Sequence, residues 1–263
     1  MTEQRLTLIL ALLALSCLLL PTRQAVAQQK YSYSVQASKP QSRKIFTQGL
    51  EIVDGQLYVS SGNYGKSRLM RFNFDDGSLD AEHRLDPRLF AEGVTVLGDR
   101  VYQLTWRAGL MLIYDREELK VVERWRIPGQ GWGLTNNGRE LVYSDGSDKL
   151  HFMSPQSGKI RRSVTVTERG KPVARLNELE WIDGQVWANI WHTQRIVIID
   201  PSNGEVQANI DLQGLLPPGE RRNDTDVLNG IAHNSRDGGI WVTGKRWPWI
   251  YRIELLPKAA DLP

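Results

Sequence analysis

Cysteine is almost absent from this chain: the sequence contains one, Cys17, which lies in an apolar N-terminal segment. A framework of disulfide bonds is therefore excluded for the rest of the chain, and so is a zinc site built from thiolates. The four histidines, His83, His151, His192 and His233, are scattered with no pair at the spacing of metal ligands. We expect no metal and no cofactor. No Ser-His-Asp, Cys-His or glycine-rich phosphate-binding arrangement is apparent.

An excess of charge of one sign is also lacking. Lys and Arg number 33 against 30 Asp and Glu, which gives a formal net charge of +3. This balance gives no reason to expect nucleic acid or an anionic membrane as a partner. Phenylalanine is scarce, with five residues against nine tryptophans. Because a buried indole N–H needs a hydrogen-bond partner, tryptophan is a costly filler and its abundance points to a specific use.

Long hydrophobic runs are missing except at the N-terminus. There an apolar run of 15 residues (6–20) follows a basic residue, and Ala25-Val26-Ala27 comes after it. Since a membrane-spanning helix needs about 20 apolar residues, the pattern favours a cleaved signal peptide over residues 1–27 rather than a membrane anchor. A lipoprotein signal at Cys17 is a weaker alternative. We expect residues 28–263 to form a single domain, without a membrane attachment, in the periplasm or outside a bacterial cell.

What the sequence has in abundance is a repeat. Each of its five copies begins with a polar residue, usually followed by Gly, and then an apolar residue. A short turn and a second apolar strand come next. The copies begin at Gln48, Glu92, Trp132, Asn177 and Asn229, at spacings of 44, 40, 45 and 52 residues. Spacings of this length, in sequence rich in strand and turn signals, are typical of one four-stranded propeller blade per repeat.

The strands within the repeats predict how the ring closes. Gly, Asp and Asn turns divide each repeat into short strands, but the fifth repeat ends after its third strand, Trp249–Leu255. Residues 31–37 alternate as a strand before the first repeat. We predict an all-β, five-bladed β-propeller with four-stranded antiparallel blades around a central channel, closed by the N-terminal strand. One irregular insertion, Gln213–Thr225, interrupts the pattern, and one hypothesis is that it covers the channel mouth and tunes access.

Equivalent positions in the repeats should face the same level of the channel. The position that opens the innermost strand forms one ring, and the position five residues past the first apolar residue of the second strand forms another. The first ring holds Gln48, Glu92, Trp132, Asn177 and Asn229, and the second holds Gly62, Trp106, Gly146, Trp191 and Lys245. A purely structural ring would repeat one residue type. Because neither ring does, the sequence favours a tailored pocket for a small polar guest over a packed polar plug.

The carboxylates near these rings have alternative roles. Glu178 and Glu180 alternate away from Asn177, so we expect them to contact the next strand or blade rather than the channel. For Glu92, the alternative to a role in chemistry is a salt bridge to an arginine.

Nine short motifs carry a resemblance to a known family. In order along the chain they are FTQGL (46–50), EGVT (92–95), LTW (104–106), GWGLT (131–135), SDGS (144–147), NELE (177–180), WANIW (187–191), DVLNGIA (226–232) and VTGK (242–245). Together they resemble the plant and bacterial type of glutaminyl-peptide cyclotransferase (glutaminyl cyclase) over residues 31–255. That family is a five-bladed β-propeller and is unrelated to the zinc-dependent animal glutaminyl cyclases.

The resemblance implies an acyltransferase that converts the N-terminal glutamine of peptides or proteins to pyroglutamate (5-oxoproline) and releases ammonia. Such peptides and proteins are the partners we expect, and we expect a monomer. The resemblance places an acid/base carboxyl at Glu92. Together with the two rings, it predicts catalytic roles for Glu92, Lys245 and Asn177 and substrate-binding roles for Gln48, Trp106, Trp132, Trp191, Asn229 and Phe46.

Two functions of other classes stay open. The first is a non-catalytic secreted propeller that binds a protein or peptide partner through its channel face, because a fold alone does not establish a function. The second is a metal-dependent propeller hydrolase of the lactonase kind. That chemistry needs several carboxylates converging on the channel, whereas the two rings supply one, Glu92.

Overall fold

The computed structural model describes residues 28–258, so the predicted signal peptide, residues 1–27, lies outside the described residues. Strands make up nearly all of the regular structure, as predicted, with one short 3-10 helix, η1 (Pro218–Glu220), in the described range. Within this range, no helix has the length and apolar character needed to cross a membrane.

The strands form three sheets of four strands, one sheet of eight and a small hairpin. The four-stranded sheets are β2 (Thr47–Val53), β3 (Gln56–Ser61), β4 (Arg68–Asn73) and β5 (Leu79–Arg84); β6 (Ala91–Leu97), β7 (Arg100–Thr105), β8 (Leu110–Asp115) and β9 (Val121–Arg126); and β10 (Leu134–Asn136), β11 (Leu141–Ser144), β12 (Lys149–Met153) and β13 (Ile160–Thr165). Consecutive strands in each sheet pair antiparallel, which confirms the predicted four-stranded antiparallel units.

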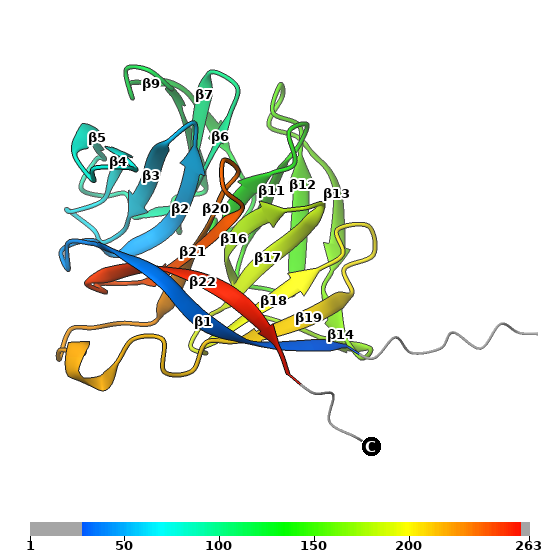
Figure 1. Ribbon diagram of the computed structural model, residues 1–263. Helices are drawn as coiled ribbons and strands as arrows, with labels where there is room; N and C mark the ends of the chain where they lie inside the picture. The colour runs from blue at the N-terminus through cyan, green and yellow to red at the C-terminus, as the bar shows by residue number, and fades with distance from the viewer. Residues whose placement is uncertain (1–27, 259–263) are drawn as a thin grey trace, which may run out of the picture.

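The eight-stranded sheet contains both ends of the described chain. Its order is β16 (Leu176–Ile182), β17 (Gln185–Ile190), β18 (Arg195–Ile199), β19 (Val206–Asp211), β1 (Gln29–Pro40), β22 (Trp249–Pro257), β21 (Gly239–Gly244) and β20 (Leu228–Asn234). The N-terminal strand β1 pairs antiparallel with the last strand β22, as predicted, and the two cross the front of Figure 1 in blue and red.

Two pairings were not predicted from the sequence. β1 also pairs in parallel with β19 along its other edge, where Gln29–Tyr31 align with Ala208–Ile210. This pair joins two groups of four strands into one sheet. Strands β14 (Thr167–Glu168) and β15 (Lys171–Pro172) form a separate hairpin between β13 and β16.

The first strands of the repeats surround a common centre. β2 contacts β6, β6 contacts β10, β10 contacts β16, β16 contacts β20, and β20 contacts β2 again. The hydrophobic core fills the spaces between neighbouring sheets, where for example Tyr58 and Leu69 pack with Val94 and Val101. Each repeat therefore presents its first residues to the same central region.

The glycine of the repeated motif is required where first strands approach each other. A Cβ atom on Gly93 would lie 2.4 Å from the backbone nitrogen of Leu134, and one on Gly133 would lie 1.9 Å from the carbonyl oxygen of Asn177. No side chain fits at such distances. The glycines thus allow the innermost strands to meet around a narrow centre.

Glu178 stands where the other repeats have glycine, and it occupies the centre itself. Its carboxylate accepts hydrogen bonds from the backbone N–H of Ile231 in β20, at 2.8 Å, and of Leu50 in β2, at 3.1 Å. Glu180 accepts one from the N–H of His233, at 2.7 Å. The predicted contact with the next strand is confirmed for both residues. The expectation that Glu178 stays away from the centre is wrong, because its carboxylate reaches across the centre to β2.

Irregular pairing in the first strands sets the direction of the polar side chains in the first ring. The register of β2, β6, β16 and β20 with their partners shifts at the position that carries Gln48, Glu92, Asn177 or Asn229. Such bulges bend a strand and re-aim its side chains. In the third repeat, Trp132 precedes β10, which begins only at Leu134.

Candidate active site

A pocket of about 200 Å³ lies where the first and second strands of the repeats meet. Its lining consists of Phe46, Gln48, Phe90, Glu92, Trp106, Trp132, Asn177, Trp191, His192, Asp226 and Lys245. The structure thus brings together every residue that the sequence predicted for the site except Asn229. No three His, Cys, Asp or Glu side chains within residues 28–258 are placed to hold a metal ion.

Glu92 is the buried acid of this pocket. Its side chain is 5% exposed, and Oε1 accepts a hydrogen bond of 3.0 Å from Nε2 of Gln48. Burial raises its pKa well above the ordinary value, while the positive charge of Lys245 acts in the opposite direction. Within the described residues, the charge acting on Glu92 comes from Lys245 and not from an arginine, so the salt bridge considered as an alternative does not form.

Asn229 supports Gln48 from below the pocket. It is fully buried and does not line the cavity, which differs from the substrate-binding position expected for it. Its Nδ2 donates to the carbonyl oxygen of Thr47 at 3.0 Å and to Oε1 of Gln48 at 3.3 Å. Because Oε1 of Gln48 accepts from Asn229, the amide nitrogen of Gln48 is directed to Glu92.

Lys245 brings an amine to the same space. Burial lowers its pKa, while Glu92 and Asp226 favour the charged form. Its Nζ lies 5.0 Å from the centre of the Phe46 ring, within the range of a cation–π contact. The lysine, which is 5% exposed, therefore has an aromatic face on one side and carboxylates as its electrostatic partners.

Asn177 offers an unused polar group. Its Oδ1 is shielded from solvent and has no hydrogen-bond partner among the described residues. A buried polar atom without a partner costs about 1–3 kcal/mol, so most such atoms are completed by the protein, by water or by a ligand. Asn177 lines the pocket and is 2% exposed, which makes it available to a guest with a hydrogen-bond donor.

Aromatic rings form the walls. Trp132 and Trp191 meet edge to face with centroids 5.3 Å apart, and Phe90 stands 5.5 Å from Trp106. The glycines of the second ring make room for these aromatic side chains: a Cβ on Gly146 would lie 2.6 Å from the Trp132 indole, and one on Gly62 would lie 2.4 Å from Phe90.

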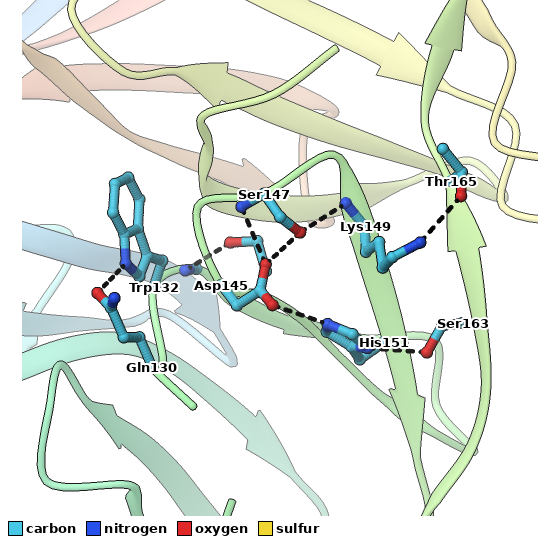
Figure 2. Close-up of polar contacts among 10 residues, drawn as sticks. Gln130, Trp132, Asp145, Ser147, Lys149, His151, Ser163 and Thr165 are labelled. Carbon is cyan, nitrogen blue, oxygen red and sulfur yellow. Dashed lines mark hydrogen bonds and ion pairs between the residues drawn. The ribbon is translucent and has the colours of Figure 1, made fainter. Parts of the chain in front are cut away.

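Figure 2 shows the polar contacts of Trp132 and those of the neighbouring turn that contains Asp145 and Ser147. Nε1 of Trp132 donates to Oε1 of Gln130 at 3.2 Å. The turn that carries Gly146 is held by Asp145, whose carboxylate accepts hydrogen bonds from the backbone N–H of Ser147 at 2.9 Å and from its hydroxyl at 2.5 Å. The network therefore keeps the turn beneath the indole in place.

The same network contains an arrangement that was not apparent in the sequence. Nε2 of His151 lies 3.1 Å from Asp145 Oδ2, and Nδ1 lies 2.8 Å from Ser163 Oγ. Antiparallel pairing of β12 with β13 sets His151 opposite Ser163, so a Ser-His-Asp line arises that chain spacing alone did not show. None of the three residues lines the pocket that contains Glu92.

Sequence reasoning missed three lining residues: Phe90, His192 and Asp226. For Phe90 a signal existed, because it precedes Glu92 by two residues as Phe46 precedes Gln48. His192 follows Trp191 directly, and its ring centre lies 4.0 Å from that of the indole. Asp226 enters from the loop before β20, outside the repeated positions.

Comparisons with known proteins show the family of this chain. Residues 8–255 match the glutamine cyclotransferase family. A glutaminyl-peptide cyclotransferase of Arabidopsis thaliana is 38% identical over 232 residues, which cover 86% of this chain and 72% of the relative. The crystal structure of a glutaminyl cyclase from Myxococcus xanthus has a TM-score of 0.82 and 33% identity, covering 88% of this chain and 99% of that one. The chain belongs to the glutamine cyclotransferase family.

Proposed function

We propose that this protein is a glutaminyl-peptide cyclotransferase that converts N-terminal glutamine to pyroglutamate and releases ammonia. The observation that carries the proposal is that one buried acid of raised pKa, Glu92, and a buried lysine, Lys245, line the same small pocket walled by indoles. The two relatives reported above are named glutaminyl-peptide cyclotransferase and glutaminyl cyclase, and both names describe this activity.

The first step closes the ring. The α-amine attacks the γ-carbonyl carbon of the same residue, so the enzyme chiefly has to hold the folded-back side chain, which Trp132 and Trp191 do as walls of the pocket. The amine must be neutral to attack, and an apolar enclosure disfavours its charged form. The new C–N bond leaves negative charge on the carbonyl oxygen, which the Lys245 amine and the Nδ2 donor of Asn177 would stabilise, while Oδ1 of Asn177 would accept from a substrate N–H.

The second step expels ammonia. The attacking nitrogen gives a proton to the Glu92 carboxylate, which passes it to the amide nitrogen as the old C–N bond breaks. No other reactant is consumed, because the proton lost by one nitrogen is gained by the other. Proton transfer by a positioned side chain contributes typically about 10²- to 10⁴-fold in rate. Gln48 holds the carboxyl in place through its 3.0 Å hydrogen bond.

The proposal also includes the blade count, the domain organisation and the location of the protein. We infer that the eight-stranded sheet is two four-stranded blades joined along β19 and β1, which makes the fold a five-bladed propeller. Residues 28–263 form one catalytic domain, monomeric and independent of a metal, that acts in the periplasm or outside the cell after removal of residues 1–27.

The test is ammonia release, with the matching mass loss, from a short peptide that begins with glutamine, measured in the presence of a chelator. We expect turnover by the wild type and a fall of about 10²- to 10⁴-fold for Glu92→Gln. Equal activity of the variant would reject the role of Glu92. No mass loss from any Gln-peptide with folded protein would reject the function itself.

A further inference from the structure

A second, larger cavity lies beside the pocket. It measures about 570 Å³. Its lining is Arg43, Lys44, Gly62, Asn63, Gly65, Lys66, Ser67, Arg68, Arg84, Leu85, Pro87, Asp224 and Arg246. Six of these residues are Lys or Arg and one is Asp, although the whole chain is close to neutral, at +3. Positive charge is therefore concentrated in this basic groove.

Phe46 stands between the pocket and the basic groove. Its ring faces the Lys245 amine on the pocket side, at 5.0 Å, and the Arg246 guanidinium on the groove side, at 5.6 Å. The carbonyl of Phe46 accepts the N–H of Gly62, at 2.9 Å, and Gly62 lines the groove. A peptide whose first residue occupies the pocket can thus continue past Phe46 into the groove.

The insertion at 213–225 is drawn in orange in Figure 1, and one of its residues, Asp224, lines the groove. Glu220 pairs with Arg43 at 3.0 Å, and Asp224 pairs with Arg246 at 3.1 Å. The insertion is therefore anchored beside the mouth of the pocket by ion pairs with two groove residues. No residue of the insertion lines the pocket itself, so the hypothesis that it covers the channel mouth stays a prediction.

Two groove lysines keep their charge unpaired. Arg68 and Arg84 share Glu82, at 3.1 and 2.8 Å, whereas the amines of Lys44 and Lys66 make no ion pair with a described residue. Both lysines are exposed. In addition, Nη1 of Arg43 and Nε of Arg68 have no acceptor among the described residues although they are shielded from solvent. The groove thus has a surplus of donors and of positive charge.

We propose that the basic groove is a subsite for acidic side chains that follow the N-terminal glutamine, so that the enzyme favours peptides with an acidic segment after their first residues. The inference rests on the proposed function. Lys44 and Lys66 supply the unpaired charge, and Arg246 lies next to the catalytic lysine. An extended peptide advances about 3.3 Å per residue, so the residues that follow the glutamine would enter the groove past Phe46.

The test compares two peptides that differ only in charge, Gln-Ala-Asp-Glu-Ala and Gln-Ala-Asn-Gln-Ala. Because exposed ion pairs are weak, we expect kcat/KM to favour the acidic peptide by about three- to tenfold, mainly through KM. Salt should reduce this ratio toward one, since the screening length falls from about 10 Å at 0.1 M to about 3 Å at 1 M. A ratio of one at low salt would overturn the proposal.

The double variant Lys44→Gln/Lys66→Gln tests the location. We expect the ratio to fall to about one, while the control Lys159→Gln/Lys171→Gln, which removes two exposed lysines outside the groove, keeps the wild-type ratio. An unchanged ratio in the groove variant would overturn the subsite. If neither peptide releases ammonia, the proposed function is rejected. The role of the groove is then tested separately by the affinities of both peptides, measured by tryptophan fluorescence. Equal affinities would then reject it.

Discussion

Gln48 donates a hydrogen bond of 3.0 Å from Nε2 to Oε1 of Glu92, and both side chains are buried. The orientation of this amide is determined by Asn229, which donates to the other end of Gln48 at 3.3 Å. Asn229, Gln48 and Glu92, which come from different repeats, therefore form a chain of hydrogen bonds. Two of them, Gln48 and Glu92, line the pocket, and the third lies beneath it.

Asn229→Ala should lower kcat more than it changes KM. Without its donor, the Gln48 amide is free to turn its oxygen to Glu92, which would displace the carboxyl. We expect a loss of about 10- to 100-fold in kcat, as for small misplacements near a reacting group. Steady-state kinetics measure it. Asn234→Ala removes a buried amide from the other end of the same strand, β20, and serves as control. Equal losses in both variants would mean general damage.

The pH profile of kcat/KM should be bell-shaped. Burial raises the pKa of Glu92 above the ordinary value of 4.5. As the pH falls, the carboxylate that the mechanism requires is therefore protonated at a higher pH than that of a free glutamate. Burial lowers the pKa of Lys245 from 10.5, so its charge is lost earlier than in free lysine as pH rises. The neutral variant Lys245→Met should abolish the basic limb and reduce kcat by about 10²- to 10³-fold. A basic limb that persists in this variant would contradict the assignment.

Glu51 should make the fold less stable as pH rises. Its carboxyl accepts the N–H of Val96 at 2.6 Å, and burial raises its pKa from 4.5 to about 8. The folded state thus holds a proton that the unfolded state releases above pH 4.5. The stability that Glu51 contributes is fully present below that pH and declines until about pH 8. Urea unfolding at several pH values measures this decline.

Glu51→Gln keeps an acceptor for Val96 and removes the titration. We expect its free energy of unfolding to vary less between pH 5 and pH 8 than that of the wild type, with a residual slope because burial raises the pKa values of Glu178 and Glu180 in the same direction. Glu254→Gln, at an exposed position, is the matched control. Identical slopes in wild type and Glu51→Gln would disprove the role of this carboxyl.

Gly133→Ala should destabilise the protein severely. Its new methyl group would lie 1.9 Å from the carbonyl oxygen of Asn177, a backbone atom that cannot turn away. Overpacking costs typically about 1–3 kcal/mol, and we expect the upper end here. Thermal unfolding measures the loss. At Gly219, which has no atom within 4 Å of an added Cβ, the same substitution should leave the melting temperature within a few degrees. Equal melting temperatures would contradict the argument.

Local pattern alone predicted most of the strands and much of the site. The repeated motif marks the first two strands of each repeat, and equivalent offsets select Gln48, Glu92, Asn177 and Lys245, which the structure brings to one pocket. This succeeded because a repeat solves the same packing problem several times, so position in the repeat specifies position around the centre. The glycine that follows the polar residue could be recognised in the sequence for the same reason.

Only the tertiary structure decided the features that depend on contacts between repeats. It placed Asn229 beneath Gln48, brought Asp226 into the pocket from a loop, and carried the Glu178 carboxylate across to Leu50. It also paired β1 with β19 and gathered the cations of the basic groove from separate segments. Periodicity records which face of a strand is buried, but the direction of a side chain at a bulge and the neighbours it meets depend on the packing of the whole chain.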